Sequence, residues 1–300
     1  GDHRDLHSFP TRRSSDLQPL PKVDMRRMLI PMGPVIVFGS SNFPLAFSVA
    51  GGDSASALAT GNPVIVKAHS GHPGTSELVA TAIRRAVEAC GLPAGVFSML
   101  HGSGKLIGTA LVKHPFACAV GFTGSRAAGR ALFDAAAARP EPIPVFAEMA
   151  SLNPIFILPE ALRERKPTLA EGLKNSITAG VGQFCTKPGL IFAPAGSGMF
   201  DAVARLVAGV PAAPLLTEGI AVGFALGTAE LAIAAGDSAA SAALPGEGYA
   251  AAARVFRVAI TDLISGSRLL EECFGPVALV CEYDDGAEAL DALAGLQGSL

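Results

Sequence analysis

Short runs of apolar residues alternate along the first half of the chain with longer segments of helical periodicity. The apolar runs are too short for helices and are bounded by Gly, Pro and Asn, which is typical of buried strands. Strands that are apolar throughout and separated by helices indicate a parallel sheet covered on both faces. Strands are predicted at residues 34–38, 63–67, 96–100, 117–122 and 144–147, and helices at residues 45–60, 75–90, 105–112 and 126–137.

The same alternation continues with longer gaps after about residue 150. The stretch 238–253 is rich in Ala, Ser and Gly and is interpreted as a surface excursion. Further strands are predicted at residues 155–158, 190–193, 255–260 and 277–281, with a helix at residues 168–179. The pattern therefore predicts a second α/β domain that begins near position 150.

Composition limits the classes of partner. Of the 300 residues, 50% are apolar and 16% are charged, which is enough apolar material for a sizeable core and argues against disorder. Lys and Arg total 23 against 26 Asp and Glu, so the net charge is −3 and nucleic acid is not an expected partner. No charged residue lies between Arg27 and Asp53, but three prolines and Ser40-Ser41-Asn42 interrupt this stretch, so no membrane span is expected.

Five cysteines, an odd number without a C-x-x-C pair, favour a reducing, cytoplasmic compartment over a disulfide framework. No histidine flanks a cysteine at ligand spacing, so no metal site is expected. Cys185 follows a helical pattern across a glycine-rich break, and Lys187 could favour its thiolate; a buried small hydrophobe is the alternative. The remaining cysteines lie in apolar segments and are predicted to be core residues: Cys90, Cys118, Cys273 and Cys281.

Polar side chains stand at the ends of three predicted strands, where ligands bind in α/β sheets. Glu148 follows the strand 144–147 and could act as a general base, or be a solvated loop acid. Asn42 follows the first strand and could donate to an oxyanion, or close an Asx turn. Lys67 ends the second strand and could bind a ribose or phosphate, or be solvated.

Three glycine-containing segments carry weaker signals. Residues 121–125, Gly-Phe-Thr-Gly-Ser, join a strand to a helix, as in phosphate sites at helix N-termini, but their spacing is not G-x-G-x-x-G. Residues 102–105, Gly-Ser-Gly-Lys, lack the rest of a P-loop and are interpreted as a helix start. Residues 271–276, Glu-Glu-Cys-Phe-Gly-Pro, precede a strand, and Glu272 is by itself interpreted as a loop acid.

Taken together, six segments in one order resemble the aldehyde dehydrogenase superfamily from about residue 31 to the C-terminus. They are Ser-Asn-Phe-Pro, Gly-Asn-Pro-Val-Ile-Val-Lys, Gly-Phe-Thr-Gly-Ser, Glu-Met, Gly-Gln-Phe-Cys and Glu-Glu-Cys-Phe-Gly-Pro. Residues 43–57 and 185–189 are most similar to its α-ketoglutaric semialdehyde (2,5-dioxovalerate) dehydrogenases. The resemblance implies a Rossmann-type parallel-sheet NAD(P)-binding domain at residues 18–149 and an α/β catalytic domain at residues 150–300.

The resemblance also implies roles for individual residues. Cys185 is the nucleophile that attacks the aldehyde, and Asn42 with the backbone N–H of Cys185 holds the oxyanion of the thiohemiacetal. Glu148 activates the water that hydrolyses the thioester. The implied cofactor contacts are Lys67 at the adenine ribose, Gly124 and Ser125 at the pyrophosphate, and Glu272 at the nicotinamide ribose, with Phe274 beside it.

Cofactor and substrate follow from the same resemblance. In NAD-preferring members an acid falls three residues after the strand-end lysine, where this chain has Ser70 beside His69. NADP is therefore expected to be accepted at least as well as NAD. The implied partner is a small aldehyde, 2,5-dioxopentanoate, which is oxidised to 2-oxoglutarate, and the full-length protein is expected to be a homo-oligomer.

The chain departs from the family pattern in several places. Ala150-Ser151 replaces a common Gly-Gly pair, and Cys273 stands where Ile is more common. Residues 1–17 have no periodicity and no apolar signal-peptide core, so they are expected to be a foreign segment. Because family members are longer at both ends, both domains are expected to be truncated. The alternatives are a non-catalytic nucleotide-binding fragment, an aldehyde dehydrogenase of different substrate, and a thiol hydrolase that uses Cys185.

Overall fold

The computed structural model describes residues 26–235, 237–240 and 248–296. The chain divides into two compact units, Gly1–Pro31 and Met32–Leu300. The described residues of the first unit form neither helix nor strand, and the segment 1–17 lies outside the described residues. Every element below belongs to the second unit.

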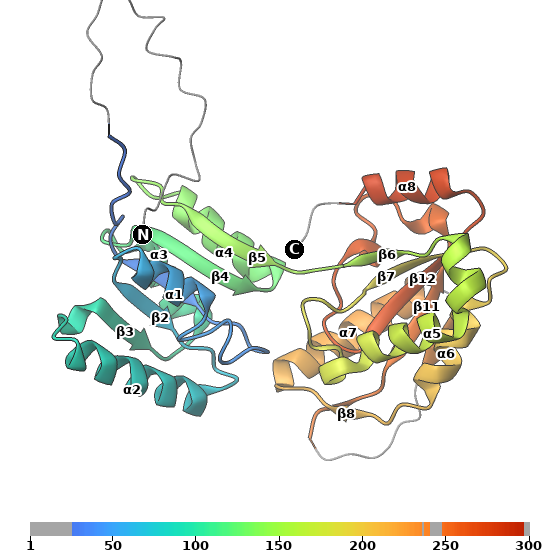
Figure 1. The fold of residues 1–300 in the computed structure, drawn as a ribbon, viewed down its shortest axis with the longest axis horizontal. Coiled ribbons are helices and arrows are strands. Elements are labelled where there is room, and N and C mark those ends of the chain that lie inside the picture. The colour runs from blue at the N-terminus through green and yellow to red at the C-terminus, as the bar shows by residue number, and fades with distance from the viewer. Residues whose placement is uncertain (1–25, 236, 241–247, 297–300) are drawn as a thin grey trace, which may run out of the picture. The chain divides into compact units, whose positions relative to one another are not determined.

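The first sheet has five parallel strands in the order β3-β2-β1-β4-β5 (Figure 1). The five strands predicted in this part of the chain are confirmed, with ends shifted by one or two residues. They are β1 (Val35–Phe38), β2 (Val64–Lys67), β3 (Phe97–Leu100), β4 (Ala119–Gly124) and β5 (Val145–Met149). Because the order reverses at β1, the carboxyl ends of β1 and β4 form the switch point at which doubly wound sheets bind dinucleotides.

Helices cover both faces of this sheet. On one face α1 (Gly52–Ala59) and α2 (Pro73–Ala89) pack against a buried cluster that includes Val37, Val64 and Phe97. On the other face α3 (Thr109–Lys113) and α4 (Arg126–Ala137) pack against Ile36, Val120 and Phe122. Ser125 caps α4 by accepting a hydrogen bond from Ala128 N, which explains why that helix has the predicted bounds.

The helix predicted at residues 45–60 is half wrong, because α1 begins only at Gly52. The preceding residues form turns in which Phe47 N donates to Phe43 O at 3.1 Å. At Gly51 a Cβ atom would lie 2.5 Å from Ala46 O, so the turn requires glycine. The helix predicted at residues 105–112 is a π-helical turn, Gly104–Gly108, followed by α3. In the part of the chain that the structure describes, no helix is long and apolar enough to cross a membrane.

The second sheet has the order β6-β7-β12-β11-β9, with parallel pairing except at the edge strand β9. Its strands are β6 (Pro154–Phe156), β7 (Leu190–Pro194), β12 (Val277–Tyr283), β11 (Arg254–Val258) and β9 (Asp237–Ala240). A separate antiparallel pair joins β8 (Ala213–Pro214) to β10 (Ala250–Ala251). The stretch 238–253, predicted to be a surface excursion, thus contributes to β9 and β10, while residues 241–247 lie outside the described residues.

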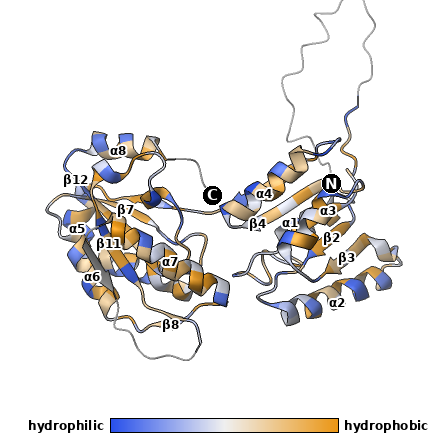
Figure 2. Cartoon of the chain, turned by 180° about the vertical axis from the view of Figure 1, so that it is seen from behind, coloured by the Kyte–Doolittle hydropathy of each residue, from blue (hydrophilic) through white to orange (hydrophobic). Residues whose placement is uncertain are grey.

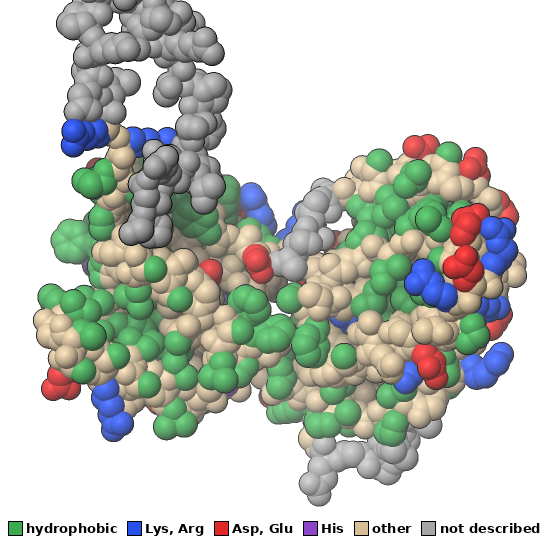
Figure 3. Space-filling model, in the orientation of Figure 1, with side chains coloured by type: hydrophobic (Ala, Val, Ile, Leu, Met, Phe, Trp, Pro, Cys, Tyr) green, Lys and Arg blue, Asp and Glu red, His purple; other side chains and the backbone are tan. Residues whose placement is uncertain are grey.

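Helices also cover both faces of the second sheet. α5 (Pro159–Thr178) and α6 (Met199–Ala208) bury one face, which includes Ile191 and Val280. α7 (Glu218–Ala234) and α8 (Gly286–Ala294) cover the other face with Phe192 and Leu279. Orange strands lie between helices of mixed colour in Figure 2, and Figure 3 shows acidic and basic side chains interspersed on one surface. The two layered sheets confirm the predicted α/β class.

The first sheet ends at Met149 in β5 and the second begins at Pro154 in β6. The division into domains at residues 18–149 and 150–300 stays a prediction. The link between the sheets is itself unusual, because Ala150 and Asn153 have positive φ angles of 57° and 44°. The left-handed turn at Ala150 would favour glycine, since a Cβ in this region costs about 1–2 kcal/mol.

Candidate active site

Cys185 lies in a turn that a crowded left-handed segment sets in place. The segment 180–182 follows α5, and Gly180, Val181 and Gly182 have φ angles of 54°, 57° and 65°. A Cβ atom on Gly182 would lie 2.4 Å from the backbone of Gly275, so only glycine fits. Val181 also has a positive φ although it is not a glycine. A β-branched residue in this left-handed conformation stores strain of about 1–3 kcal/mol. The glycine-rich segment predicted from the sequence therefore determines the path of the backbone that leads into Cys185.

The carbonyl groups around Cys185 are held by donors from three parts of the chain. Gln183 O accepts from Asn42 Nδ2 at 2.9 Å, and Phe184 O accepts from the backbone N–H of Lys187 at 3.2 Å. Cys185 O accepts from the Ser151 hydroxyl and from Asn153 Nδ2, the latter at 2.5 Å. Successive peptide planes on both sides of the cysteine are thus oriented.

The backbone N–H of Cys185 points away from the Phe184 carbonyl, because the two groups are trans in one planar peptide. Among the described residues it donates to no acceptor. The Cys185 side chain is half-buried. A partly exposed thiol beside an unused N–H donor is the arrangement that nucleophilic attack on a carbonyl group requires.

Asn42 is brought to this turn as the sequence predicted, although 141 residues separate it from Gln183. The hydrogen bond to Gln183 O uses one amide hydrogen and leaves the second for another acceptor. Phe43, the next residue, meets the Phe184 ring edge-on at a centroid distance of 5.4 Å. These contacts place an amide donor beside the cysteine turn; its role at an oxyanion stays a prediction.

Glu148 is exposed and lies within β5, paired with Thr123, rather than after the strand as predicted. Burial raises the pKa of the Asp53 carboxyl above its usual value, and the negative charge of Glu148 raises it further. The two carboxylates are therefore close enough to repel each other. Asp53 also lies over β4, because a Cβ on Gly121 would be 2.9 Å from Asp53 Oδ2. In the described residues no hydrogen bond joins Glu148 to Cys185, and its role as base stays a prediction.

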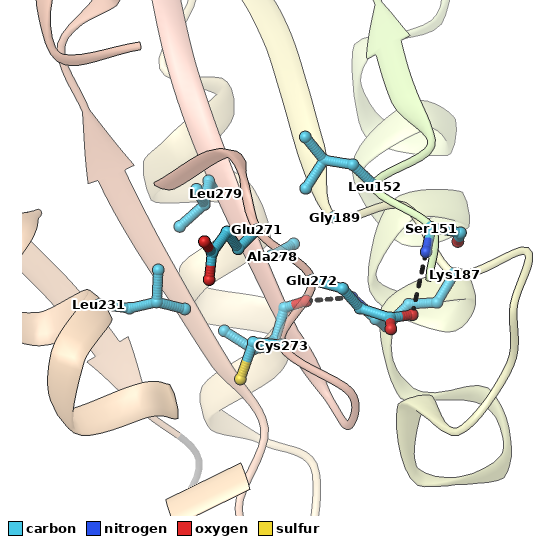
Figure 4. A pocket seen from close by; sticks show the side chains of 11 residues that line it. Ser151, Leu152, Lys187, Gly189, Leu231, Glu271, Glu272, Cys273, Ala278 and Leu279 are labelled. Carbon is cyan, nitrogen blue, oxygen red and sulfur yellow. Dashed lines mark hydrogen bonds between the residues drawn. The ribbon is translucent and has the colours of Figure 1, made fainter. Parts of the chain in front are cut away.

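Glu272 is half-buried rather than a solvated loop acid. Its Oε1 accepts a hydrogen bond from the backbone N–H of Ser151 at 3.2 Å (Figure 4). Burial raises the pKa of the Glu272 carboxyl, while the Ser151 N–H and the charge of Lys187 oppose that rise. Glu272 therefore lines a small cavity together with Ser151, Lys187 and Cys273.

Lys187 differs most from its sequence interpretation. Instead of serving the Cys185 thiolate, its ammonium group is buried and donates to Val277 O at 2.7 Å. Burial lowers the pKa of Lys187 to about 8, and the nearby Cys273 and Glu272 oppose this shift. The lysine thus ties the cysteine turn to the start of β12.

Lys187 gives the folded protein a specific pH dependence. Between pH 8 and 10.5 the folded state binds fewer protons at this group than the unfolded state, so its contribution to stability rises with pH. Below pH 8 both states hold the proton and the cost of burying the charge is constant. Between pH 8 and 10.5 we therefore expect the unfolding free energy of the wild type to rise by roughly 3 kcal/mol relative to that of the Lys187→Met variant. Urea unfolding at several pH values measures the difference.

Lys105→Met is the matched control, because Lys105 is exposed. The stability difference between this variant and the wild type should be flat over the same pH range. An equally flat difference for Lys187→Met would contradict the buried-ammonium interpretation.

Four of the predicted cofactor residues, Lys67, Ser70, Gly124 and Ser125, lie at or just beyond the carboxyl edge of the first sheet. Lys67 ends β2 and is only 7% exposed, which corrects the solvated alternative, and burial lowers its pKa. Ser70 is exposed, three residues further on. Gly124 ends β4, and Ser125 caps the twelve-residue helix α4, whose first N–H groups face the sheet edge. Phe274 is half-buried in the loop that carries Glu272.

These positions fit a dinucleotide. The strand order places β2 and β4 on either side of β1, so a strand-end cation and a helix N-terminus flank the switch point. His69 adds a ring beside Lys67, and its pKa is lowered to about 4 by burial, by His72 and by Lys67. Among the described residues no group of His, Cys, Asp and Glu could hold a metal ion.

Comparison with known proteins decides the family. The profile of the aldehyde dehydrogenase family matches residues 10–214. The chain belongs to the aldehyde dehydrogenase family. The resemblance inferred from the motifs is thereby confirmed, and the match overlaps the end of the segment 1–17 that was predicted to be foreign.

Two curated relatives of the family are similar over most of the chain. Alpha-ketoglutaric semialdehyde dehydrogenase 2 of Azospirillum brasilense is 49% identical over 292 residues, which is 94% of this chain and 54% of that protein. Alpha-ketoglutaric semialdehyde dehydrogenase of Acinetobacter baylyi is 44% identical over 289 residues, again 94% and 54%. The chain thus spans about half the length of the curated relatives it matches.

A solved structure of the same family confirms the fold. The NAD-dependent benzaldehyde dehydrogenase from Corynebacterium glutamicum is 26% identical and superposes with a TM-score of 0.71, covering 89% of this chain and 58% of that one. The predicted aldehyde dehydrogenase-like architecture of two α/β halves agrees with this similarity.

Two predictions about the family member's cysteines need correction. Cys273 and Cys281 are buried as predicted, but Cys90 is exposed and Cys118 is half-buried. Cys90 caps the C-terminus of α2, where the apolar periodicity of the helix has already ended. The sequence analysis also missed Ser151 and Asn153 as hydrogen-bond donors to the cysteine turn. Only the polar pair in an otherwise apolar link between two strands could have indicated them.

Proposed function

We propose that the chain carries the nucleophile, the general base and the cofactor contacts of an NAD(P)-dependent oxidation of an aldehyde to a carboxylate. The observation that supports the proposal is the turn at Cys185, where Asn42 and an unused backbone N–H meet a half-buried thiol. The rest of the mechanism is assigned to residues of the same chain.

Cys185 Sγ attacks the aldehyde carbon as the thiol proton passes to solvent water, and the oxyanion that forms accepts hydrogen bonds from Asn42 Nδ2 and the Cys185 N–H. A bound NADP or NAD would supply the acceptor for the hydride of this carbon, and loss of that hydride leaves a thioester on Cys185. Glu148 takes a proton from water as the water attacks the thioester, and the carboxylate product leaves while Cys185 regains its thiol. Glu272, held by Ser151, orients the nicotinamide ribose, and Lys67 the adenine ribose.

The proposed aldehyde is 2,5-dioxopentanoate, with 2-oxoglutarate as product. This finer assignment rests on the similarity to the two alpha-ketoglutaric semialdehyde dehydrogenases, at 49% and 44% identity. The cytoplasmic location and the homo-oligomer implied by the resemblance belong to the same proposal.

The test is formation of the reduced nicotinamide, followed by absorbance, with 2,5-dioxopentanoate, benzaldehyde and propanal as substrates. Turnover that is fastest with 2,5-dioxopentanoate supports the substrate. Turnover that is faster with another aldehyde keeps the reaction and replaces the substrate. Release of acid from a thioester, without any change in the nicotinamide, would instead support a thiol hydrolase.

A second candidate is a fragment that binds the nucleotide without turnover. The span of about half the relatives' length favours considering it for this chain. Binding of NADP in isothermal titration calorimetry, in the absence of turnover with any aldehyde, is the result expected for it.

Cofactor preference gives a separate prediction. Ser70 is exposed close to Lys67, and no carboxylate occupies this position to repel a 2′-phosphate. We expect NADP to be used at least as well as NAD, and Ser70→Glu to weaken NADP binding by about 1–3 kcal/mol, roughly five- to 150-fold. The ratio of kcat/KM for the two cofactors measures the effect.

Ser70→Gln is the matched control, since it adds a side chain of the same size without charge. It should change the cofactor ratio much less than Ser70→Glu. A wild type that strongly prefers NAD would refute the assignment.

A further inference from the structure

One buried residue, Ser151, contacts two parts of the site described above. Ser151 is 5% exposed and lies three residues after Glu148, in the link between the two sheets. Its hydroxyl donates to Cys185 O, while its backbone N–H donates to Glu272 Oε1 (Figure 4). A single buried residue therefore contacts both the nucleophile turn and the carboxylate assigned to the cofactor.

The Ser151 hydroxyl is itself oriented by a hydrogen bond, which an isolated serine side chain would lack. Asn153 Nδ2 donates to Ser151 Oγ at 2.9 Å, and the same amide reaches Cys185 O and Lys187 O at 2.5 and 3.1 Å. The serine oxygen thus accepts one hydrogen bond and donates another, which orients and strengthens both. Asn153 itself is fixed by its left-handed backbone, with φ of 44°.

The position of Ser151 gives this contact a consequence for chemistry. A glycine at this position would supply the N–H to Glu272 but no hydroxyl to Cys185. Without that hydroxyl the peptide between Cys185 and Thr186 has only the shared amide of Asn153 as a donor. Fewer hydrogen bonds would then hold the backbone that orients the Cys185 thiol.

We propose that Ser151 is a positioning residue for Cys185, and that its hydroxyl fixes the nucleophile while its N–H independently fixes Glu272. The proposal rests on the assignment of Cys185 as nucleophile. It predicts that the two contacts can be separated, because alanine removes the hydroxyl and keeps the N–H.

The test compares wild type, Ser151→Ala and Thr228→Val. Thr228 is the matched control, because it also buries a hydroxyl that donates to a backbone carbonyl, Phe224 O at 2.8 Å, within its own helix α7. The rate of alkylation by iodoacetamide is measured at each cysteine by mass spectrometry, and the affinity for NADP by isothermal titration calorimetry. The rate of the first burst of reduced cofactor is measured alongside.

In Ser151→Ala we expect alkylation of Cys185 to rise about two- to tenfold, as expected when one hydrogen bond that holds a turn is lost. Alkylation of Cys118 and Cys273 should not change, and the affinity for NADP should stay within about twofold, because the N–H to Glu272 remains. The burst should slow about tenfold, since a misplaced nucleophile reacts more slowly. Thr228→Val should show none of these changes.

Wild-type values for both Cys185 alkylation and the burst in Ser151→Ala would overturn the proposal. A uniform rise at all cysteines would overturn it as well, because it would indicate general loosening. Should Ser151→Ala not fold, Ser151→Gly removes the same hydroxyl and is judged by the same criteria. Failure of the proposed function is distinguished by Cys185→Ala: retained turnover there rejects the nucleophile, whereas the alkylation rates test the contact without any turnover.

Discussion

Replacing Cys185 by alanine is expected to abolish aldehyde oxidation, by at least about three orders of magnitude in kcat, while nucleotide binding persists. The thiol is the atom that forms the covalent bond, and no other described cysteine lies in the turn held by Asn42 and Ser151. Alanine keeps the backbone N–H and the carbonyl contacts, so the turn should survive. Turnover and NADP affinity measured on one preparation check both halves of the expectation.

The other cysteines provide the controls. Cys90→Ala should leave both activity and stability unchanged, because the side chain is exposed, and Cys118→Ala should cost stability only. Retained turnover in Cys185→Ala would reject covalent catalysis at this residue.

Glu148→Gln is expected to separate the two halves of the reaction. Hydride transfer requires no base for water, so the variant should release about one reduced cofactor per site in a fast burst. Steady turnover should then fall about 10²- to 10⁴-fold, the usual contribution of a general base. Rapid-mixing absorbance measures the burst and the slow phase together.

Glu141→Gln serves as a control, because Glu141 is an exposed acid outside the strand. It should show wild-type burst and turnover. Loss of the burst itself in Glu148→Gln, with normal cofactor affinity, would assign Glu148 to a step before hydride transfer.

The elements that the sequence predicted well are those whose signals are local. β1 and β2 are continuous apolar runs bounded by Pro, and α4 begins where Ser125 can cap it. α7 was missed because its residues are apolar on most sides, so no helical periodicity stands out. The start of α1 was wrong because the apolar spacing at residues 45–51 belongs to turns closed by backbone hydrogen bonds.

The site was predictable as a set of residues but not as a set of contacts. The motifs indicated Asn42, Glu148 and Cys185, yet Ser151 and Glu272 meet across 121 positions and Asn42 and Gln183 across 141. Such pairs depend on how the two sheets place their loops, and local periodicity carries no information about them. The interpretation of Lys187 failed for the same reason, since its partner is the carbonyl of Val277.

The close approach of Gly182 to Gly275 has an implication for how this family member can be recombined. The two backbones leave no room for a Cβ atom at residue 182, and Gly275 itself has φ of 138°. A chimera that takes residues 180–189 from one parent and residues 271–277 from another combines two segments whose backbones must pack closely but come from different proteins. Crossover points should therefore be chosen so that both segments are inherited from the same parent, whereas exchange of the exposed α2 surface should be tolerated.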